Sequence, residues 1–327
     1  MIARLLHSRE TALVIVLAVV FTLFALLTPN FLDAFSLLER TRYWIVPGLL
    51  AIPMTFIIAT AGIDLSVGAI VALCAVVGGL LHTDFGWPMP LAAAAAMATG
   101  TLAGAFNGSV SSFLRIPPLV VTLATMTLYR GMALRLSEAR SFSSFPDTFL
   151  WISQGDLFSF GAGRLGPLFF PVPLATLIVV GAVGAVLLRK SWIGRYTEHI
   201  GANPTAAVFA AIPVPWITCG LYTACGAVCG LTALFHTALY ASAKADAATG
   251  MELEAIAAVV VGGTRISGGH ASVSGSLLGL CLIGMLRYGL ELAGAPSEWI
   301  IIIVGVLLIA TVVLNEALAR RAATRSL

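Results

Sequence analysis

Four polar side chains interrupt or border the apolar runs of this sequence. Asp64 and Ser66 separate two runs in the string ATAGIDLSVGAIVAL, and Glu252 and Glu254 open another in GMELEAIAAVVVGG. Charged side chains within membrane-type segments are costly, and they often mark a pathway for a solute or a proton. We therefore treat all four residues as candidates for lining or gating a pathway.

Each pair also has a purely structural interpretation. Ser66 follows Asp64 by two residues, which is the spacing of a local cap at the start of the next helix. Glu252 and Glu254 fall in the first turn of a short predicted helix, where acids are favoured by the positive helix end. Glycine pairs close that helix, and such broken helices are also common at the binding sites of transporters.

Motifs for catalysis, nucleotide binding or metal binding are missing from the sequence. It contains no G-x-x-x-x-G-K-[ST] phosphate loop and no H-E-x-x-H metal motif, and its five histidines are scattered. Cys225 and Cys229 share a helix face, but no histidine or carboxylate lies close in sequence to complete a metal site. We expect no enzyme activity, no cofactor and no metal on this chain.

Composition places the chain in a membrane. Of its 327 residues 59% are hydrophobic and only 10% are charged, whereas soluble domains carry about a quarter charged residues. The net charge of +3 without a basic patch argues against nucleic-acid binding. Backbone groups in lipid must be satisfied within a segment, and the short alternating strands of a barrel are missing. The prediction is an all-α polytopic protein with a single transmembrane domain over 1–327.

Ten apolar runs are candidates for spans across a hydrocarbon core of about 30 Å. They are 11–28, 44–60, 67–82, 88–112, 117–136, 167–188, 217–239, a short one at 252–264, 271–292 and 298–316. The first run is longer than the core of a signal peptide, so we interpret it as a retained span. Arg130 and Arg287 fall within spans, and they are the candidate partners if Asp64 forms an ion pair.

Basic residues predict the orientation of the ten spans. If the N-terminus is inside, the inner segments hold Arg4, Arg9, Arg115, Arg189, Lys190, Arg195, Arg265, Arg320, Arg321 and Arg325, and the outer segments hold Arg40, Arg42, Arg135, Arg140, Arg164 and Lys244. Ten against six favours both termini in the cytoplasm. The long segment 137–166 then lies outside, where its aromatic and polar residues suit the membrane surface.

Glycines repeat every four residues in three of the predicted spans. The repeats are Gly100, Gly104 and Gly108, then Gly226 and Gly230, and then Gly275 and Gly279. Small residues at this spacing let helix backbones approach closely. We expect tight packing within one bundle, with a contact between two copies of the chain as the alternative.

The inner segment 195–216 contains a short predicted helix. Asn203 can cap a helix whose first residue is Pro204, and Pro213 ends it. The helix would present small apolar side chains, namely Ala206, Ala207, Ala210 and Ala211, after the turn at Gly201. An exposed patch of this kind suits a protein partner; the alternative is a helix lying on the membrane interface.

Three strings together resemble a known family. GIDLSVGAI, IGANPTAAVFAAIPV and GMELEAIAAVVVGGTRISGG occur in the order and spacing of the permease subunits of carbohydrate-type ABC importers, the ribose, xylose, rhamnose, galactofuranose and autoinducer-2 group. The resemblance covers about 44–315. The AAIPV ending and the ALCAVVGGLL run favour the rhamnose and autoinducer-2 branch. The family usually has Gly-Ile before the end of the inner helix, where this chain has Ala211-Ile212 and then Pro213.

The resemblance implies a ten-helix permease in the bacterial inner membrane that pairs with a second permease, identical or related. A separate ATP-binding subunit would hold the Mg-ATP and dock on the inner helix, and a periplasmic binding protein would deliver a monosaccharide or similar small polar solute. Three alternatives remain: a permease of the same superfamily for branched-chain amino acids or nucleosides, an ion-coupled secondary transporter, and a membrane enzyme. The few buried acids and the lack of a catalytic motif favour the sugar importer.

Overall fold

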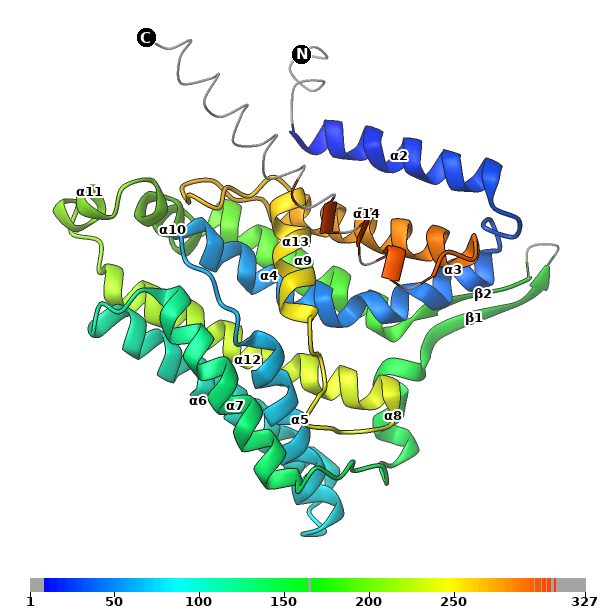
Figure 1. The fold of residues 1–327 in the computed structure, drawn as a ribbon, viewed down its shortest axis with the longest axis horizontal. Coiled ribbons are helices and arrows are strands. Elements are labelled where there is room, and N and C mark those ends of the chain that lie inside the picture. The colour runs from blue at the N-terminus through cyan, green and yellow to red at the C-terminus, as the bar shows by residue number, and fades with distance from the viewer. Residues whose placement is uncertain are drawn as a thin grey trace.

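The computed structural model describes residues 9–163, 166–296, 298–300, 302–303, 305–306 and 309. Within these residues, helices pack into one bundle, and a two-stranded sheet projects from its edge (Figure 1). Seven described helical segments are long and apolar enough to cross a membrane, and Val67–Thr83 is a shorter apolar helix. The predicted polytopic helical fold is confirmed.

The helices follow the predicted spans closely. The long ones are α2 (Arg9–Leu27), α4 (Ile45–Ala59), α5 (Val67–Thr83), α6 (Met89–Phe113), α7 (Pro118–Ser137), α9 (Val172–Lys190), α12 (Val214–Tyr240) and α14 (Val273–Leu292). The short ones are α3 (Ala34–Thr41), the 3-10 helix η1 (Arg42–Trp44), α8 (Asp147–Gln154), α10 (Trp192–Ala202), α11 (Pro204–Phe209) and α13 (Met251–Val261). The last predicted span, 298–316, lies mostly outside the described residues.

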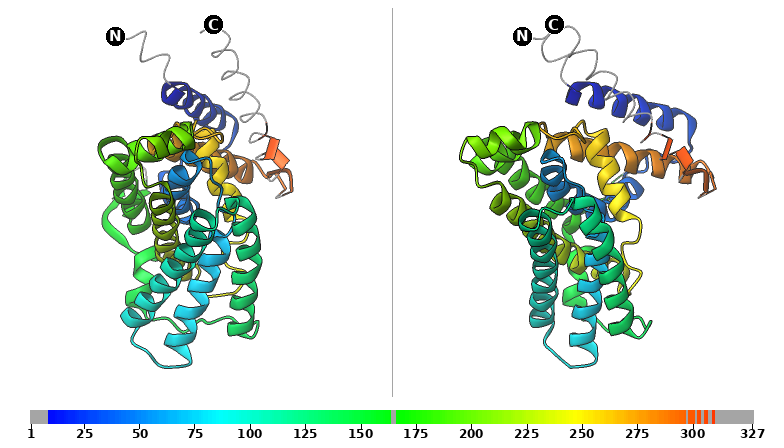
Figure 2. Two further views of the ribbon diagram at one scale, coloured as in Figure 1. Left: turned by 90° about the vertical axis from the view of Figure 1, so that its left-hand side faces the viewer. Right: turned by 60° about the vertical axis from the view of Figure 1, so that its left-hand side comes forward.

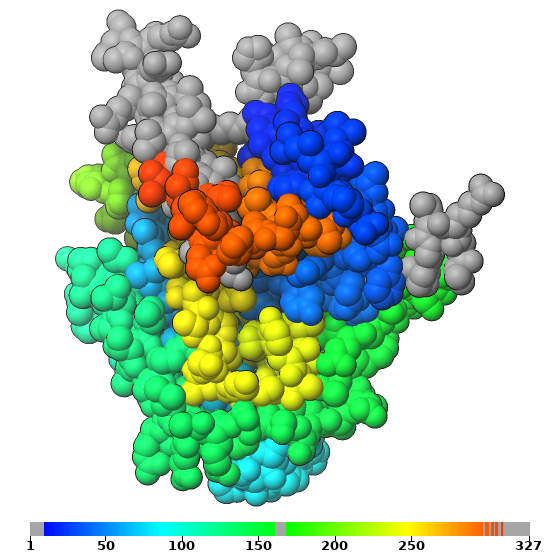
Figure 3. All heavy atoms as spheres, turned by 45° about the vertical axis from the view of Figure 1, so that its right-hand side comes forward, coloured from blue at the N-terminus to red at the C-terminus, as the bar shows by residue number. Residues whose placement is uncertain are grey.

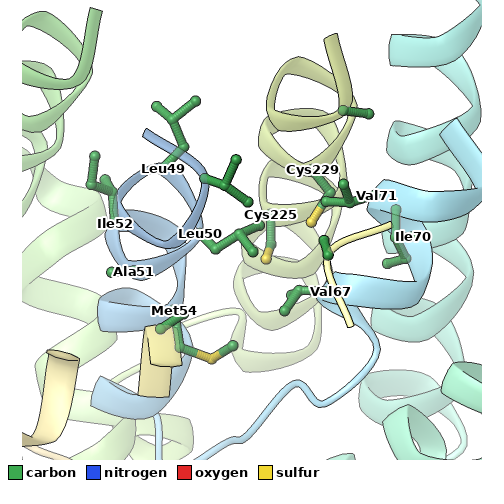
Figure 4. Packing of buried hydrophobic residues seen from close by; sticks show 14 of the residues in the cluster. Leu49, Leu50, Ala51, Ile52, Met54, Val67, Ile70, Val71, Cys225 and Cys229 are labelled. Atoms are coloured by element: carbon green, nitrogen blue, oxygen red, sulfur yellow. The ribbon is translucent and has the colours of Figure 1, made fainter. Parts of the chain in front are cut away.

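Helix α4 forms the centre of the bundle. All of its residues are buried, and it packs against α9, α12, α13 and α14. Figure 4 shows Leu50 of α4 next to Cys225 of α12 and Val67 of α5. Cys225 is buried and free, as expected of a small apolar core residue. Helix α4 therefore has no side that faces lipid.

Glycines let α6 and α12 pack backbone against backbone. A Cβ added at Gly104 would overlap the carbonyl oxygen of Tyr222, and one added at Gly226 would overlap that of Gly100. Hydrophobicity does not drive helices together in lipid, so close van der Waals contact must do so. The predicted role of the glycine repeats within one bundle is confirmed for this helix pair.

Helix α2 lies along one side of the bundle, against α14 (Figure 2). Most of its side chains are exposed, as is expected of a helix that faces lipid. Part of its contact with the bundle is aromatic: Phe24 stacks on Phe31 with ring centroids 5.6 Å apart, and Phe24 packs where Gly289 of α14 leaves room for the ring. Tyr288 completes this small cluster.

The predicted outer loop 137–166 contains regular structure that the sequence analysis missed. It includes α8 and an antiparallel hairpin of β1 (Asp156–Gly163) and β2 (Gly166–Pro171). The predicted start of a span at 167 is wrong, because residues 166–171 pair with β1 and α9 begins at Val172. The apolar residues of the second strand had extended the hydrophobic run beyond the helix.

A buried arginine fixes the base of this hairpin. Arg42 is 5% exposed and donates to the carbonyl oxygens of Ser153 at 3.0 Å and Gly155 at 2.9 Å. Its guanidinium also pairs with Asp156 at 2.6 Å. Because both the charge and the donors of Arg42 are satisfied, the arginine can be buried where α8 passes into β1.

Segments predicted on the same side of the membrane meet at the same end of the bundle. At the end that carries α11, Glu10 pairs with Arg189 at 2.9 Å and accepts from Ser272 at 2.6 Å. At the opposite end, which carries the hairpin, Asp84 pairs with Arg140 at 3.1 Å. We name these the α11 end and the hairpin end.

We predict that Gly226→Ala lowers the melting temperature of the detergent-solubilised protein, because the added methyl group overlaps the backbone of Gly100. The expected cost is about 1–3 kcal/mol, as for overpacking in a core. Gly220→Ala is the matched control on α12, since an added Cβ there meets nothing within 4 Å and alanine favours the helix. Equal melting temperatures for the two variants would contradict the packing argument.

Candidate functional site

Asp64 lies in a buried coil between α4 and α5. Its side chain is 0% exposed, and Oδ1 accepts from the backbone N–H of Ser66 at 2.9 Å and from its hydroxyl at 2.6 Å. This is an Asx turn, in which a carboxylate bonds the backbone two residues on. The predicted local turn between Asp64 and Ser66 is present, but Asp64 does not cap α5: its N-cap residue is Ser66, which makes no side-chain capping bond.

Ser66 extends this turn into a polar network across three helices. The amide nitrogen of Asn107 on α6 donates to the Ser66 hydroxyl at 2.8 Å. The hydroxyl of Tyr129 on α7 lies 3.2 Å from Asn107 Oδ1 and 3.0 Å from the carbonyl oxygen of Ala103. Sequence analysis did not identify Asn107 or Tyr129; a buried asparagine in the apolar run of α6 was the signal available.

The alternative in which Asp64 pairs with Arg130 or Arg287 is not what the structure shows, because both arginines have other partners. Arg130 donates to the carbonyl oxygens of Ala245 at 2.7 Å and Ala247 at 2.9 Å, and Arg287 pairs with Glu254. Within the described part of the chain, Asp64 Oδ2 and the buried hydroxyl of Tyr222 have no hydrogen-bond partner. Asp64 is thus held by its own turn, with one oxygen left over.

Glu252 and Glu254 face different neighbours although they share the first turn of α13. Glu252 is 8% exposed and accepts from the backbone N–H of Gly250 at 3.2 Å, which confirms the capping interpretation. Its other oxygen lies against Gly68, where a Cβ would overlap it. Residues two apart on a helix point about 200° apart, so Glu254 instead reaches Arg287 on α14.

The first turns of α5 and α13 therefore adjoin within the bundle, at Gly68 and Glu252. Ser66, the N-cap residue of α5, takes part in the network that includes Asp64. Helix N-termini that meet inside a bundle suit transport sites, because they present positive dipole ends to polar groups. Of the four predicted pathway residues, Asp64, Ser66 and Glu252 lie at this junction, whereas Glu254 points away from it to Arg287.

The glycine-rich segment after α13 contacts the end of α10. Gly269 donates from its backbone to the carbonyl oxygen of Ala59, the last residue of α4, at 2.9 Å. A Cβ at Gly201 would overlap the same carbonyl oxygen, and one at Gly268 would lie 2.9 Å from the Cα of Gly201. Two motifs that are far apart in sequence, IGANP and RISGG, thus meet at the α11 end.

Helix α11 begins as predicted. Asn203 Oδ1 accepts from the backbone N–H of Ala206 at 3.0 Å, and Pro204 is the first helical residue. The helix ends at Phe209, and Ala211 turns the chain with a left-handed φ of 57°. The predicted end at Pro213 is therefore four residues too late.

The exposed face of α11 differs from the predicted one. Ala206, Ala210 and Ala211 are exposed, but Ala207 is 3% exposed and packs with Ile200, Ile212 and Ile217. The expectation that Ala207 lies on the contact surface is therefore wrong. Val208 and Phe209 project instead, with exposed fractions of 60% and 87%. Phe209 is the more prominent apolar side chain.

Comparison with known proteins gives this arrangement a family. Residues 36–312 match the family model described as the branched-chain amino acid transport system / permease component. The chain belongs to this permease family. It is 34% identical to the autoinducer 2 import system permease protein LsrD of Escherichia coli (strain SMS-3-5 / SECEC) and 33% identical to that of Shigella flexneri, over 98% of each chain. No solved structure matches the permease.

The permease match covers both candidate regions, the α5–α13 contact and the α10–α11 segment. Within the described residues, no group of three or more His, Cys, Asp or Glu is placed to hold a metal ion. Several polar groups of the permease interior bond to one another or to backbone carbonyl oxygens, as at Ser66 and Arg130. Their arrangement suits positioning of helices and contact with a solute.

We predict that Asp64→Asn leaves the permease folded and active, whereas Asp64→Ala destabilises it. The asparagine oxygen can keep both bonds from Ser66, and the variant buries no charge. Alanine leaves two buried donors unpaired, at a cost of about 1–3 kcal/mol. Asp147→Ala, at an exposed position in α8, is the control. Thermal stability and solute uptake are the measurements; loss of uptake in a stable Asp64→Asn protein would show that the charge itself is used.

Proposed function

We propose that this permease is the membrane subunit of an ABC importer that moves a sugar or sugar-like polar solute into the cell. The observation that carries the proposal is the similarity over 98% of the chain to proteins named autoinducer 2 import system permeases. The family description names branched-chain amino acids, but the full-length relatives favour the sugar-like class. The sequence strings GIDLSVGAI and IGANPTAAVFAAIPV support the same choice.

Energy for import must come from another chain, because this sequence has no phosphate-binding loop. The α11 end offers a surface for that chain. Phe209 and Val208 project from a short helix between α9 and α12, and an apolar side chain exposed to this extent suits a pocket on a protein partner. In our proposal the ATP-binding subunit docks there, a second permease completes the pathway, and a periplasmic protein delivers the solute to the hairpin end.

The proposal also sets the orientation. The α11 end faces the cytoplasm, and both termini lie on that side, because ten basic residues fall in the segments assigned to it and six in the others. The localisation is the bacterial inner membrane. The hairpin end, with α8 and the β1–β2 pair, then faces the periplasm.

We predict that Phe209→Asp prevents copurification with the ATP-binding subunit and abolishes ATP-driven uptake, because a carboxylate would have to enter an apolar contact unpaired. The permease itself should keep its melting temperature, since Phe209 is 87% exposed. Phe160→Asp is the matched control: this phenylalanine is 65% exposed and lies at the hairpin end. Normal copurification of Phe209→Asp would refute the docking site.

Orientation has its own test. We predict that Phe209→Cys reacts with a membrane-impermeant thiol reagent only in inside-out vesicles, and that Phe160→Cys reacts only in intact spheroplasts. The native Cys74, Cys225 and Cys229 are buried and should stay unlabelled. The reverse labelling pattern would overturn the proposed topology. The docking site would then face the periplasm, where no ATP-binding subunit could reach it.

A further inference from the structure

A pocket of about 160 Å³ opens near the hairpin end of the bundle. Three parts of the chain form it: the α3–α4 segment, the region from the end of α12 to the start of α13, and the outer half of α14. Figure 3 shows the face on which these segments adjoin, in blue, yellow and orange. The pocket brings together one predicted pathway residue, Glu254, with groups that the sequence analysis did not connect to it.

Two ion pairs form the polar wall of this pocket. Arg287 of α14 pairs with Glu254 of α13, and Arg40 of α3 pairs with Glu291 of α14 at 2.8 Å. All four side chains line the pocket, so its formal charge is zero. A charged solute would have to break one of these pairs, whereas a neutral solute can accept from the arginines and donate to the carboxylates.

The Arg287–Glu254 pair keeps capacity for such bonds. It joins Arg287 Nη2 to Glu254 Oε1, and the side chains remain 39% and 16% exposed. A guanidinium has five N–H donors in a fixed plane and a carboxylate has two acceptor oxygens. The pair therefore retains N–H donors on Arg287 and an acceptor oxygen on Glu254 that can bond hydroxyl groups.

Aromatic rings form a second wall of the pocket. Tyr43 and Tyr240 lie with ring centroids 6.4 Å apart, and Trp44 lies beside them in the pocket lining. The Trp44 indole packs onto α14 at Gly284, where any side chain would collide with it. Rigid aromatic faces offer apolar contact to the C–H groups of a ring, and a few convergent polar groups fix its orientation.

We propose that this pocket is a subsite for a neutral, polyhydroxylated solute on the transport pathway, with Glu254 and Arg287 bonding its hydroxyl groups and Tyr240 contacting its carbon face. The inference rests on the proposed import function and specifies where the permease itself contacts the solute. It accounts for two ion pairs and four aromatic side chains that line one cavity close to the end from which the solute would arrive.

The first test is protection of the pocket by solute. Met251→Cys, in the pocket lining, is treated with a small thiol reagent in the reconstituted complex of permease, ATP-binding subunit and binding protein. Ribose and autoinducer 2 are the two probes. At a solute concentration about ten times its dissociation constant, the rate of labelling should fall about tenfold. Labelling of Phe160→Cys, outside the pocket, should not change with either solute.

Variants of the two walls separate solute binding from a structural latch. Glu254→Gln and Tyr240→Leu should each reduce the protection and lower uptake, while ATP hydrolysis by the complex continues. If the Glu254–Arg287 pair only holds α13 to α14, loss of protection in Glu254→Gln would reflect a disturbed structure. Tyr240→Leu leaves that pair in place, so protection should then stay normal in this variant. Glu138→Gln is the control for Glu254→Gln, since Glu138 is exposed and lies outside the pocket.

The outcomes are distinguishable. Import of either probe by the wild-type complex without protection of Met251→Cys, or with protection unchanged in both wall variants, overturns the subsite and leaves the proposed function intact. A wild-type complex that imports neither probe and shows no protection overturns the proposed sugar-type function together with the subsite. Protection that is lost in Tyr240→Leu and in Glu254→Gln supports the subsite.

Discussion

Direct contact between helix backbones is the constraint on which the rest of this structure depends. Lipid is as apolar as the side chains of these helices, so burial of apolar surface cannot assemble them. Gly104 and Gly226 instead bring α6 and α12 together without intervening side chains, and Gly279 does the same for α14 where a Cβ would overlap the carbonyl oxygen of Ala258 on α13. The buried turn at Asp64 and the first turn of α13 keep their positions because these helices cannot slide apart without losing that contact.

Polar groups inside this framework are held in place by bonds to other groups of the protein. Asp64 is fixed by Ser66, and Glu252 is fixed by the backbone of Gly250. Arg130 bonds to two carbonyl oxygens of the segment before α13. Each group is therefore oriented before any solute arrives, which lowers the cost of arranging the site on binding. Glu254 differs, because it and its partner Arg287 are both partly exposed.

The sequence predicted those features of the fold that depend on neighbouring residues along the chain. The lengths of the apolar runs gave α5 and α12 within a few residues, and Asn203 and Pro204 gave the start of α11. The exposed side of α11 was not predictable, because a helix of six residues is too short to show an apolar stripe. The β1–β2 pair was missed for a related reason: the apolar strand Gly166–Pro171 continues directly into α9. The Arg287–Glu254 pair joins residues whose proximity only the fold creates.

The contact among Gly201, Gly268 and Ala59 has a mechanical consequence. Side chains that touch can absorb a small displacement by changing rotamer, at little cost in energy. Three backbone segments in contact have no such slack, and the Gly269–Ala59 hydrogen bond adds a directional restraint. A displacement of α10 at the membrane surface is therefore transmitted directly to the segment that follows α13. The junction is therefore a rigid connection between the surface of the permease and its interior. Longer side chains could enter it only if the backbones first moved apart.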